Sequence, residues 1–488
     1  MKTIASSALP ANVQFPQYAR QQLRSRIVHF GFGAFHRAHQ ALLTNRVLNA
    51  HGGDWGICEI SLFSGDVLMS QLRQQDHLFT VMEKSAAGNQ PIIVGAVKEC
   101  LNAKLDSLAA IIEKFCEPQV AIVSLTITEK GYCIDPATGH LDLTQPRIIH
   151  DLASPTEPHS APGILVEALH RRRERGLSAF TVLSCDNIPD NGHVVKNAVL
   201  DMAKQRDPQL ASWIAEYVSF PGTMVDRIVP AATEDSLAEI TRELGVEDPC
   251  AISCEPFIQW VIEDNFVAGR PDWGSVGAQM VDDVLPWEEM KLRMLNGSHS
   301  FLAYLGYLAG YAHISDCMQD ASFRRAARHL MMAEQAPTLR ITDVDLNAYA
   351  DSLIERFSNP ALQHRTWQIA MDGSQKLPQR LLDGIRIHLK AGTPWPLLAL
   401  GVAAWMRYVS GADDAGNAID IRDPLAEKIH ALVINSHDDS RVEALLTLQE
   451  VFGRDLPANP QFVQAIKDAW QTLVEQGARQ ALLNALNG

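Results

Sequence analysis

The segment from Lys291 to His299 holds the residues of this chain that are best suited to acid–base chemistry. It carries an amine in Lys291, an amide in Asn296 and an imidazole in His299 within nine residues. An amine can accept a proton when its pKa is lowered, and an amide or an imidazole can bond an oxygen atom nearby. Lys291 is therefore the candidate proton acceptor, and Asn296 and His299 are its candidate hydrogen-bonding neighbours.

The same segment is predicted to lie on a helix, because Pro286 suits a first helical position and acidic residues follow it in the first turn. At about 100° per residue, Glu288, Lys291, Asn296 and His299 fall within an arc of roughly 140°. Two leucines share this arc, so the polar groups lie in an apolar face. Such a face fits either a buried functional site or a core network whose polar groups satisfy one another.

The composition is that of a globular protein without a general basic surface. The chain has 488 residues, 47% of them hydrophobic and 20% charged, with a formal net charge of −15. This length allows two or three domains. The acidic balance argues against nucleic acid and anionic membranes as partners, but a few local cations would still suffice for a small anionic substrate.

Cysteine usage and the N-terminus indicate a cytoplasmic protein. The eight cysteines are scattered and none forms a CxxC pair, so free thiols in a reducing compartment are expected. The N-terminus shows no signal peptide, and no stretch of about 18 apolar residues indicates a membrane span. His29, His36 and His39 do not have metal-ligand spacing, so no bound metal is expected.

Short strands and helices alternate in the first part of the chain, and helices alone dominate the rest. The alternation favours an α/β fold with a mostly parallel sheet over residues 1–285. Amphipathic patterns of helical period predict a mostly α-helical domain over residues 286–488. The predicted strands are 26–30, 55–62, 92–97, 120–127 and 180–185, and the predicted helices of the second domain are 287–311, 320–335, 345–357, 361–371, 376–390, 396–409, 423–434, 440–452 and 460–487.

A glycine-rich turn follows the first predicted strand and precedes a helix, which is the arrangement of dinucleotide-binding sites. Gly31 would permit the tight turn, and Gly33 would let the backbone approach a pyrophosphate at the helix N-terminus. Phe35 and Arg37 are further candidate cofactor contacts, and Arg37 would either bond phosphate or cap the surface. Because His36 stands at the place of the third fingerprint glycine, an ordinary β–α turn is the alternative.

An acidic residue about 20 residues beyond the glycines usually bonds the adenosine ribose. Glu59, inside the second predicted strand, and Asp66, in the turn after it, are the two candidates. Asp66 is better placed if the strand ends near Leu62, although it could instead cap the next helix. An acid here would repel a 2′-phosphate, so NAD is expected in preference to NADP.

Four motifs occur in order along the chain: Gly31–Gln40, Ser184–Asn187, Thr223–Arg227 and Lys291–His299. On these motifs, nearly the whole chain resembles the mannitol dehydrogenase family of polyol-specific long-chain dehydrogenases, and within it the fructuronate reductases. The resemblance implies an N-terminal Rossmann-type domain, a mostly helical C-terminal domain and a cleft between them. It also implies metal-independent hydride transfer between a nicotinamide and a sugar-derived secondary alcohol.

The resemblance assigns roles to five residues. It makes Lys291 the general base, and it makes Asn296 and His299 the residues that bind the reacting oxygen. Asn187 would help to bind that oxygen, and Asp226 would support the site. These roles agree with the chemistry, because hydride loss from an alcohol requires removal of the hydroxyl proton. Negative charge then develops on the oxygen, where hydrogen-bond donors stabilise it.

The turn after the fourth predicted strand bears on the substrate. Polyol members of the family typically carry a second glycine where this chain has Lys130. Ligands of open α/β sheets lie at the carboxyl ends of the strands, so Lys130 would pair with a substrate carboxylate, or else be a solvated surface lysine. Arg365 and Arg380 are further candidates for the carboxylate and Lys376 for sugar hydroxyls, with helix-end or interdomain ion pairs as the alternative.

We therefore expect an NAD-dependent oxidoreductase that interconverts D-mannonate and D-fructuronate. The nearer alternative is a polyol dehydrogenase for mannitol, arabinitol or a similar neutral sugar alcohol. The remote alternative is a nucleotide-binding protein without catalysis. The expected partner is a small-molecule sugar acid or polyol, with no nucleic acid and no membrane, and the family tends towards monomers or small homo-oligomers.

Overall fold

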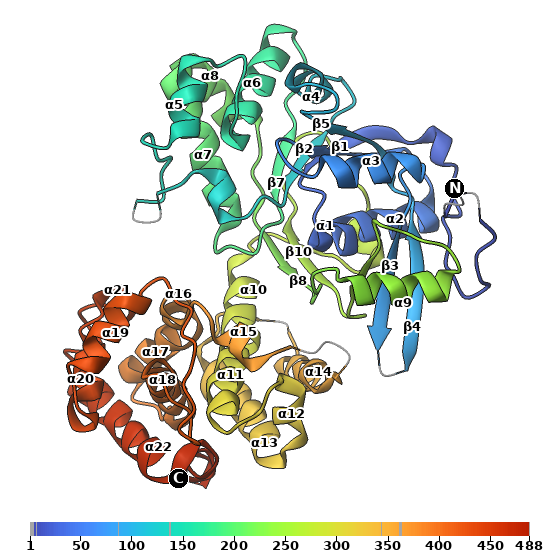
Figure 1. Ribbon diagram of the computed structural model, residues 1–488. Coiled ribbons are helices and arrows are strands. Elements are labelled where there is room, and N and C mark those ends of the chain that lie inside the picture. The colour runs from blue at the N-terminus through green and yellow to red at the C-terminus, as the bar shows by residue number, and fades with distance from the viewer. Residues whose placement is uncertain are drawn as a thin grey trace. The chain divides into compact units, whose positions relative to one another are not determined.

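The computed structural model divides the chain into two compact units, Met1–Leu285 and Pro286–Gly488 (Figure 1). Each unit has hydrophobic core clusters of its own. The structure describes residues 4–5, 7–85, 87–135, 138–342, 344–360 and 364–487.

The first unit is built on a five-stranded sheet in the order β5-β2-β1-β6-β7. Every neighbouring pair in this sheet is parallel. The strand order reverses between β1 and β6, and such a switch point is where open α/β sheets bind dinucleotides. The strands are β1 (Arg24–Phe30), β2 (Trp55–Ser61), β5 (Val97–Asn102), β6 (Ile122–Leu125) and β7 (Thr181–Ser184).

Helices cover both faces of this sheet. Ile27 of β1 packs in one core cluster with Ala38 and Leu42, whereas its neighbour Val28 packs in another with Ile164. Burial of both faces explains the apolar runs that predicted these strands, and in Figure 1 helices α6 and α7 lie beside β7. The helices are α1 (Ala34–Ala38), α2 (Gln40–His51), α3 (Asp66–Gln74), α4 (Leu108–Phe115), α5 (Pro146–Ala153), α6 (Ala161–Glu174), α7 (Asn191–Arg206), α8 (Pro208–Tyr217) and α9 (Glu234–Leu244), with 3₁₀ turns η1 (Arg20–Gln22), η2 (Glu129–Tyr132) and η3 (Trp273–Val276).

Two three-stranded sheets complete the first unit, in the orders β4-β3-β9 and β11-β10-β8. The predicted strand over 92–97 is wrong as a single element, because it joins the end of β4 to the start of β5. Strand β4 instead pairs antiparallel with β3, which the sequence analysis missed. The added strands are β3 (Phe79–Ser85), β4 (Gly88–Val94), β8 (Thr223–Asp226), β9 (Ile252–Cys254), β10 (Gln259–Glu263) and β11 (Gln279–Val281).

The second unit is helical, and the predicted fold class is confirmed. Its described residues form no β-structure beyond isolated bridges. Helix α12 was not predicted, and the predicted helix over 361–371 begins outside the described residues. The α-helices are α10 (Leu285–Met290), α11 (Ser298–Leu308), α12 (Ile314–Gln319), α13 (Ala321–His329), α14 (Leu346–Ser358), α15 (Thr366–Ala370), α16 (Gly373–Leu377), α17 (Asp383–Ala391), α18 (Pro396–Val409), α19 (Ala426–Ile434), α20 (Arg441–Leu446), α21 (Gln449–Phe452) and α22 (Pro460–Asn487).

Three segments among the described residues of the second unit are π-helical, and short 3₁₀ turns accompany them. The π segments are η4 (Lys291–Gly297), η5 (Leu330–Gln335) and η8 (Pro378–Leu382), and the 3₁₀ turns are η6 (Ala336–Thr338) and η9 (Asp438–Ser440). Segment η4 packs against both η5 and η8. Because π-helical turns are rare and frequently mark functional sites, this junction is a place to look for one.

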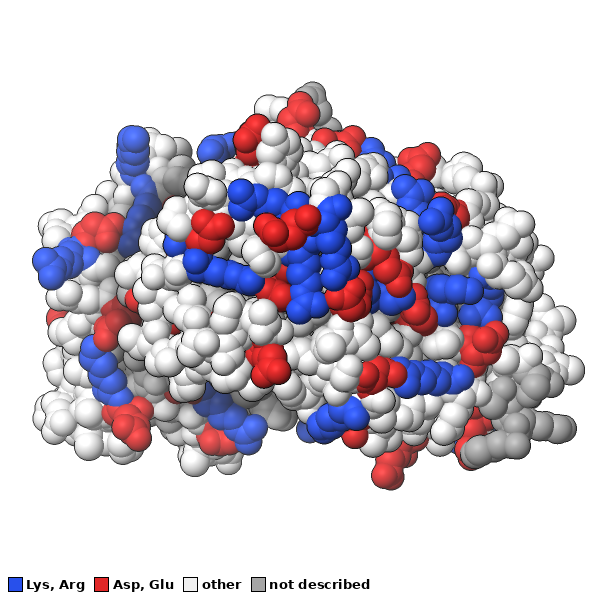
Figure 2. Space-filling view, turned by 90° about the horizontal axis from the view of Figure 1, so that it is seen from above, with Lys and Arg blue, Asp and Glu red and all other residues white. Residues whose placement is uncertain are grey.

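The surface charges are mixed in sign. On the face shown in Figure 2, basic and acidic side chains of the described residues are interspersed and form no continuous basic strip. Many of them form ion pairs, as Arg171 and Arg175 do with Glu113 at 2.8 Å each. Nucleic-acid-binding faces instead gather Lys and Arg into a patch or stripe. Among the described helices, none has the length and apolarity to cross a membrane.

Candidate functional site

The turn between β1 and α1 brings the backbone of Gly31 and Gly33 to the switch point of the sheet. Gly31 has a φ of +103° and donates its N–H to Ile60 O at 3.0 Å. A Cβ at residue 31 would lie 2.3 Å from Thr126 O, so this position requires glycine. A Cβ at residue 33 would meet only Gly31 O, at 3.9 Å, which leaves this backbone open on one side. Such a turn fits a pyrophosphate.

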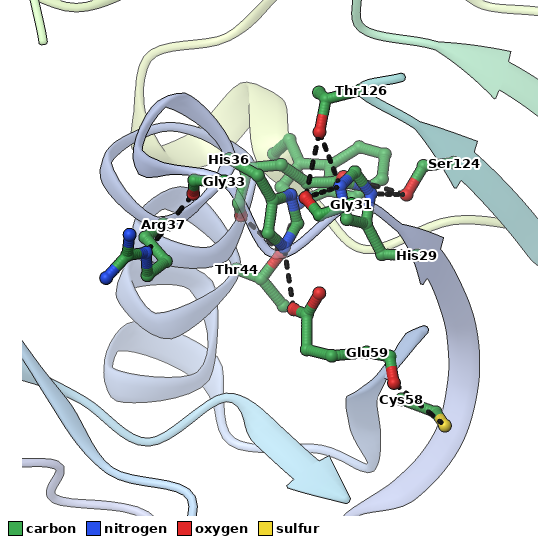
Figure 3. Close-up of polar contacts among 12 residues, drawn as sticks. His29, Gly31, Gly33, His36, Arg37, Thr44, Cys58, Glu59, Ser124 and Thr126 are labelled. Carbon is green, nitrogen blue, oxygen red and sulfur yellow. Dashed lines mark hydrogen bonds and ion pairs between the residues drawn. The ribbon is translucent and has the colours of Figure 1, made fainter. Parts of the chain in front are cut away.

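A buried polar network lies beneath this turn (Figure 3). His36 stands where the fingerprint has its third glycine, and its Nε2 lies 2.7 Å from Glu59 Oε1. The ring of His36 stacks on that of His29 with the centroids 3.4 Å apart. His29 Nδ1 lies 2.7 Å from Ser124 Oγ. Burial raises the pKa of Glu59 to about 7 and lowers the pKa of His36 to about 3.

His29, His36 and Glu59 together have the donor types of a metal site, with candidate ligand atoms within 4.8 Å of one another. Their orientation does not suit a shared ion. The two imidazole planes are only 12° from parallel, so their lone pairs run side by side and do not converge as ligand lone pairs must. Both nitrogens of His29 also have hydrogen-bonding neighbours already. The trio is therefore better described as a hydrogen-bond network.

The two acidic candidates for the ribose differ sharply in exposure. Glu59 is fully buried and bonded to His36, so its predicted contact with a ribose is not possible in this conformation. Asp66 is partly exposed, and its Oδ1 accepts a hydrogen bond from Lys104 Nζ at 2.9 Å. The N-cap of α3 is Gly65, so Asp66 does not cap that helix. Asp66 stays the candidate for the ribose.

Arg37 is buried, and Phe35 is partly buried. The Arg37 guanidinium donates to Cys250 O and, at 3.2 Å, to Gly33 O, so the predicted surface role is wrong. Burial lowers the pKa of Arg37. The Phe35 ring stacks on His39 at a centroid distance of 4.7 Å. Arg37 thus anchors the turn to the loop before β9.

The loop after β6 is held by an aspartate that the sequence analysis did not single out. Asp186 accepts hydrogen bonds from Ile127 N at 3.0 Å, from Thr128 N at 2.9 Å and from the Tyr132 hydroxyl. Lys130 lies within the short η2 turn of this loop and is exposed, which both of its predicted roles allow. Asp186 lies in the motif Ser184–Asn187, next to the candidate Asn187. Its place in that motif was the one sequence feature that could have pointed to it.

The next two candidates of the first unit lie at the ends of β7 and β8. Asn187 is exposed just beyond β7, and Asp226 is the buried last residue of β8. Asn191 links these strands, because its Nδ2 donates to Asp186 O at 3.0 Å and to Thr223 O at 2.9 Å. Asn187 and Asp226 therefore lie next to segments that the buried side chain of Asn191 holds together.

The segment Lys291–His299 is not the continuous α-helix that was predicted. Lys291 through Gly297 form the π-helical segment η4, and α11 begins at Ser298. In a π-helix the backbone bonds run from i to i+5, so Asn296 lies one turn beyond Lys291. The side chains of Lys291, Asn296 and His299 are all buried. Buried polar side chains on a π-helical turn are compatible with the functional site that the residue types of this segment predict.

Gly297 lets the three π segments approach one another closely. A Cβ at residue 297 would lie 2.6 Å from Arg380 O on η8 and 2.6 Å from Gln335 Nε2 on η5. The neighbouring Ser298 hydroxyl donates to Gln335 Oε1 at 3.0 Å. The backbone at Arg380 is thereby held against the turn that carries Asn296.

We expect Gly297→Ala to lower the free energy of unfolding by about 1–3 kcal/mol, because the added methyl group overpacks this junction. Gly384→Ala in α17 is the matched control, since a Cβ there would meet Leu398 at an ordinary 3.7 Å. The control is expected to be neutral or stabilising. Urea denaturation of both variants measures the difference, and equal stabilities would contradict this account of the junction.

Two cationic side chains of the second unit bond only uncharged oxygens among the described residues. Lys376 Nζ donates to Met371 O and, at 3.2 Å, to Ile369 O. Arg380 Nη1 donates to Ser300 Oγ at 3.0 Å and lies 3.5 Å from Asn296 O. The ion pairs considered for these two residues are therefore absent from the described part of the chain.

Burial lowers the pKa of Lys376 to about 8 and that of Arg380 to about 10. The pKa of His299 is lowered well below its usual value, first by burial and then by neighbouring cations that include Arg380 and Lys376. Arg380 Nε and His299 Nε2 have no hydrogen-bond partner among the described residues. Arg365, by contrast, is exposed at the start of α15. An anion would relieve the shared positive charge around His299.

Comparison with known proteins bears on both units. The family model described as mannitol dehydrogenase Rossmann domain matches residues 25–275, and the mannitol dehydrogenase C-terminal domain matches residues 283–474. The chain is 78% identical over 486 residues to the uncharacterized oxidoreductase YeiQ of Escherichia coli K12, covering 100% of each. It is 59% identical over 485 residues to D-mannonate oxidoreductase of the same organism, covering 99% of each. It also matches the structure of Pseudomonas fluorescens mannitol 2-dehydrogenase in a ternary complex with NAD and D-mannitol, at 40% identity, a TM-score of 0.84 and 98% coverage of each chain.

Proposed function

Because the chain belongs to the mannitol dehydrogenase family of oxidoreductases, we propose that it interconverts a sugar acid and its keto form with NAD. D-mannonate and D-fructuronate are the leading pair. The observation that carries this choice is the pair Lys376 and Arg380, two half-buried cations whose hydrogen-bond partners among the described residues are all uncharged. Asp372 and Asp423 already offset part of the charge of Lys376, but a substrate carboxylate would bond the two cations directly, which a neutral polyol cannot do.

In the proposed mechanism Lys291 takes up the hydroxyl proton of the substrate, and Asn296, His299 and Asn187 hold the reacting oxygen. Lys291 is only 5% exposed, so its amine is shielded from bulk water. His299 is uncharged at neutral pH because of its lowered pKa, so it serves as a hydrogen-bond donor through one N–H. Each such donor contributes about 3 kcal/mol to stabilising the developing charge. Asp226 supports the site, and no metal is required.

NAD, when bound, supplies the carbon that accepts the hydride. Gly31 and Gly33 would hold its pyrophosphate, because the turn is tight on one side and open on the other. Asp66 would bond the adenosine ribose and disfavour the 2′-phosphate of NADP. The eight cysteines of the chain are free and buried, which supports a reducing, cytoplasmic location.

Steady-state kinetics with a panel of sugar acids and polyols and with both nicotinamide cofactors test this function. We expect a higher kcat/KM for D-mannonate with NAD than for mannitol, arabinitol or any reaction with NADP. Turnover of mannitol without turnover of mannonate would instead establish the polyol dehydrogenase, the function named for the Pseudomonas fluorescens relative.

Lys130→Gly gives a second, smaller test of the substrate class. Lys130 is exposed, and exposed ion pairs are worth roughly 0.2–1 kcal/mol, so kcat/KM for mannonate should fall by about twofold to fivefold. The value for a neutral polyol should not change. Equal effects on both substrates would remove Lys130 from carboxylate recognition.

A further inference from the structure

The place of the third fingerprint glycine is taken by a buried histidine. In the usual fingerprint that glycine allows close packing of helix on strand. Here the His36 ring fills the space, stacks on His29 at 3.4 Å and lies 2.7 Å from the carboxyl of Glu59. Figure 3 shows these side chains, from β1, α1 and β2, meeting beneath the turn.

His29 connects the stacked rings to the turn itself. Its Nε2 lies 3.1 Å from Gly31 O and 2.9 Å from Thr126 Oγ1. On the other side, Nδ1 lies 2.7 Å from Ser124 Oγ, which bonds Gln40 Oε1 at 2.8 Å. A shift of the stacked rings would therefore move the backbone of the turn.

His36 and Glu59 share one proton away from solvent. Both side chains are 0% exposed, and a 2.7 Å separation requires a hydrogen between the two atoms. Burial favours the neutral pair, a carboxylic acid bonded to a neutral imidazole, over two buried charges. The other titratable groups that act on Glu59 are His29 and Arg37, and both favour its ionised form less strongly than burial opposes it.

We propose that His36 and Glu59 are positioning residues for the cofactor: as a neutral, proton-sharing pair they hold the Gly31–Gly33 turn through His29 without touching the cofactor themselves. This inference rests on the proposed function only in taking NAD as the ligand of the turn. By its spacing, Glu59 would be expected to bond the adenosine ribose. The inference gives its carboxyl group a different role, which is to hold the turn.

Titration of NADH binding by fluorescence tests the proposal without any substrate. Glu59→Gln keeps the shape and the neutral hydrogen bond, so its Kd at pH 6.5 should stay within about threefold of the parent value. Glu59→Ala removes the bond and should weaken NADH binding by about tenfold or more. Glu167→Gln is the matched control, because it alters another buried carboxylate of the same unit, paired with Arg206 at 2.6 Å. Its Kd should not change.

The pH dependence separates positioning from simple packing. As pH rises through about 7, Glu59 loses its proton and places a buried negative charge beneath the phosphates. The Kd of the parent protein should then rise by about tenfold between pH 6 and pH 8.5, while that of Glu59→Gln stays flat. Identical pH profiles, or a folded Glu59→Ala that binds NADH normally, would overturn the positioning role. Failure of the parent protein to bind NADH at any pH would overturn the proposed cofactor as well.

Discussion

Lys291→Ala is expected to lower turnover by about 10²–10⁴-fold, because it removes the proposed proton acceptor. NADH binding should not change, since the role proposed for Lys291 is towards the substrate hydroxyl and not towards the cofactor. Stopped-flow measurement of hydride transfer at saturating substrate and cofactor reports this step directly. The pH–rate profile should also lose the limb that belongs to the base.

The control for this variant is Lys390→Ala, an exposed lysine in α17 of the same unit. It should leave turnover and NADH binding as they are. A Lys291→Ala protein that is folded and turns over within about tenfold of the parent rate would exclude Lys291 as the general base, because general bases contribute at least about 10²-fold.

Arg380→Met is expected to have the second largest effect, and a selective one. Removing one partner of a buried, hydrogen-bonded charge pair costs about 2–5 kcal/mol, so kcat/KM for D-mannonate should fall by at least about 30-fold. The loss should appear mainly in KM, because the carboxylate is bound in the ground state and in the transition state alike. Residual turnover of a neutral polyol should fall much less.

The contacts of Arg380 to Ser300 and Asn296 make a structural effect of this variant the main alternative. Arg380→Lys keeps the charge but loses the fork of donors, and it should recover part of the mannonate activity. Ser300→Ala removes the hydroxyl partner alone and should affect both substrate classes equally. If Arg380→Met also lowered activity on both classes equally, the carboxylate would have to bind elsewhere.

The fold was largely predictable because its signals are local. The strands of the parallel sheet are buried on both faces, so each appears as an apolar run, and the second unit shows helical periodicity almost throughout. The β3–β4 hairpin was missed because the apolar residues of β4 continue into β5 with only Gly95 and Ala96 between them. A run of this kind does not reveal where the chain reverses.

The candidate site was predictable only where residue type decides it. The amine, amide and imidazole of the segment Lys291–His299 are evident from the sequence, but its π turn and the close approach of Arg380 O to Gly297 are not. Glu59 was a reasonable candidate for the ribose by its spacing. Its partner His36 lies on another element, and such a tertiary hydrogen bond leaves no mark in the spacing.

Asp186 holds the backbone of the loop after β6 through contacts that do not depend on the side chain of Lys130. Its carboxylate holds two backbone N–H groups and the Tyr132 hydroxyl, and none of these bonds involves the side chain of Lys130. A mutation at Lys130 can therefore exchange glycine, lysine or another side chain on a loop whose path stays the same. Relatives could in this way come to prefer acidic or neutral sugars through single substitutions, without first having to evolve a new loop.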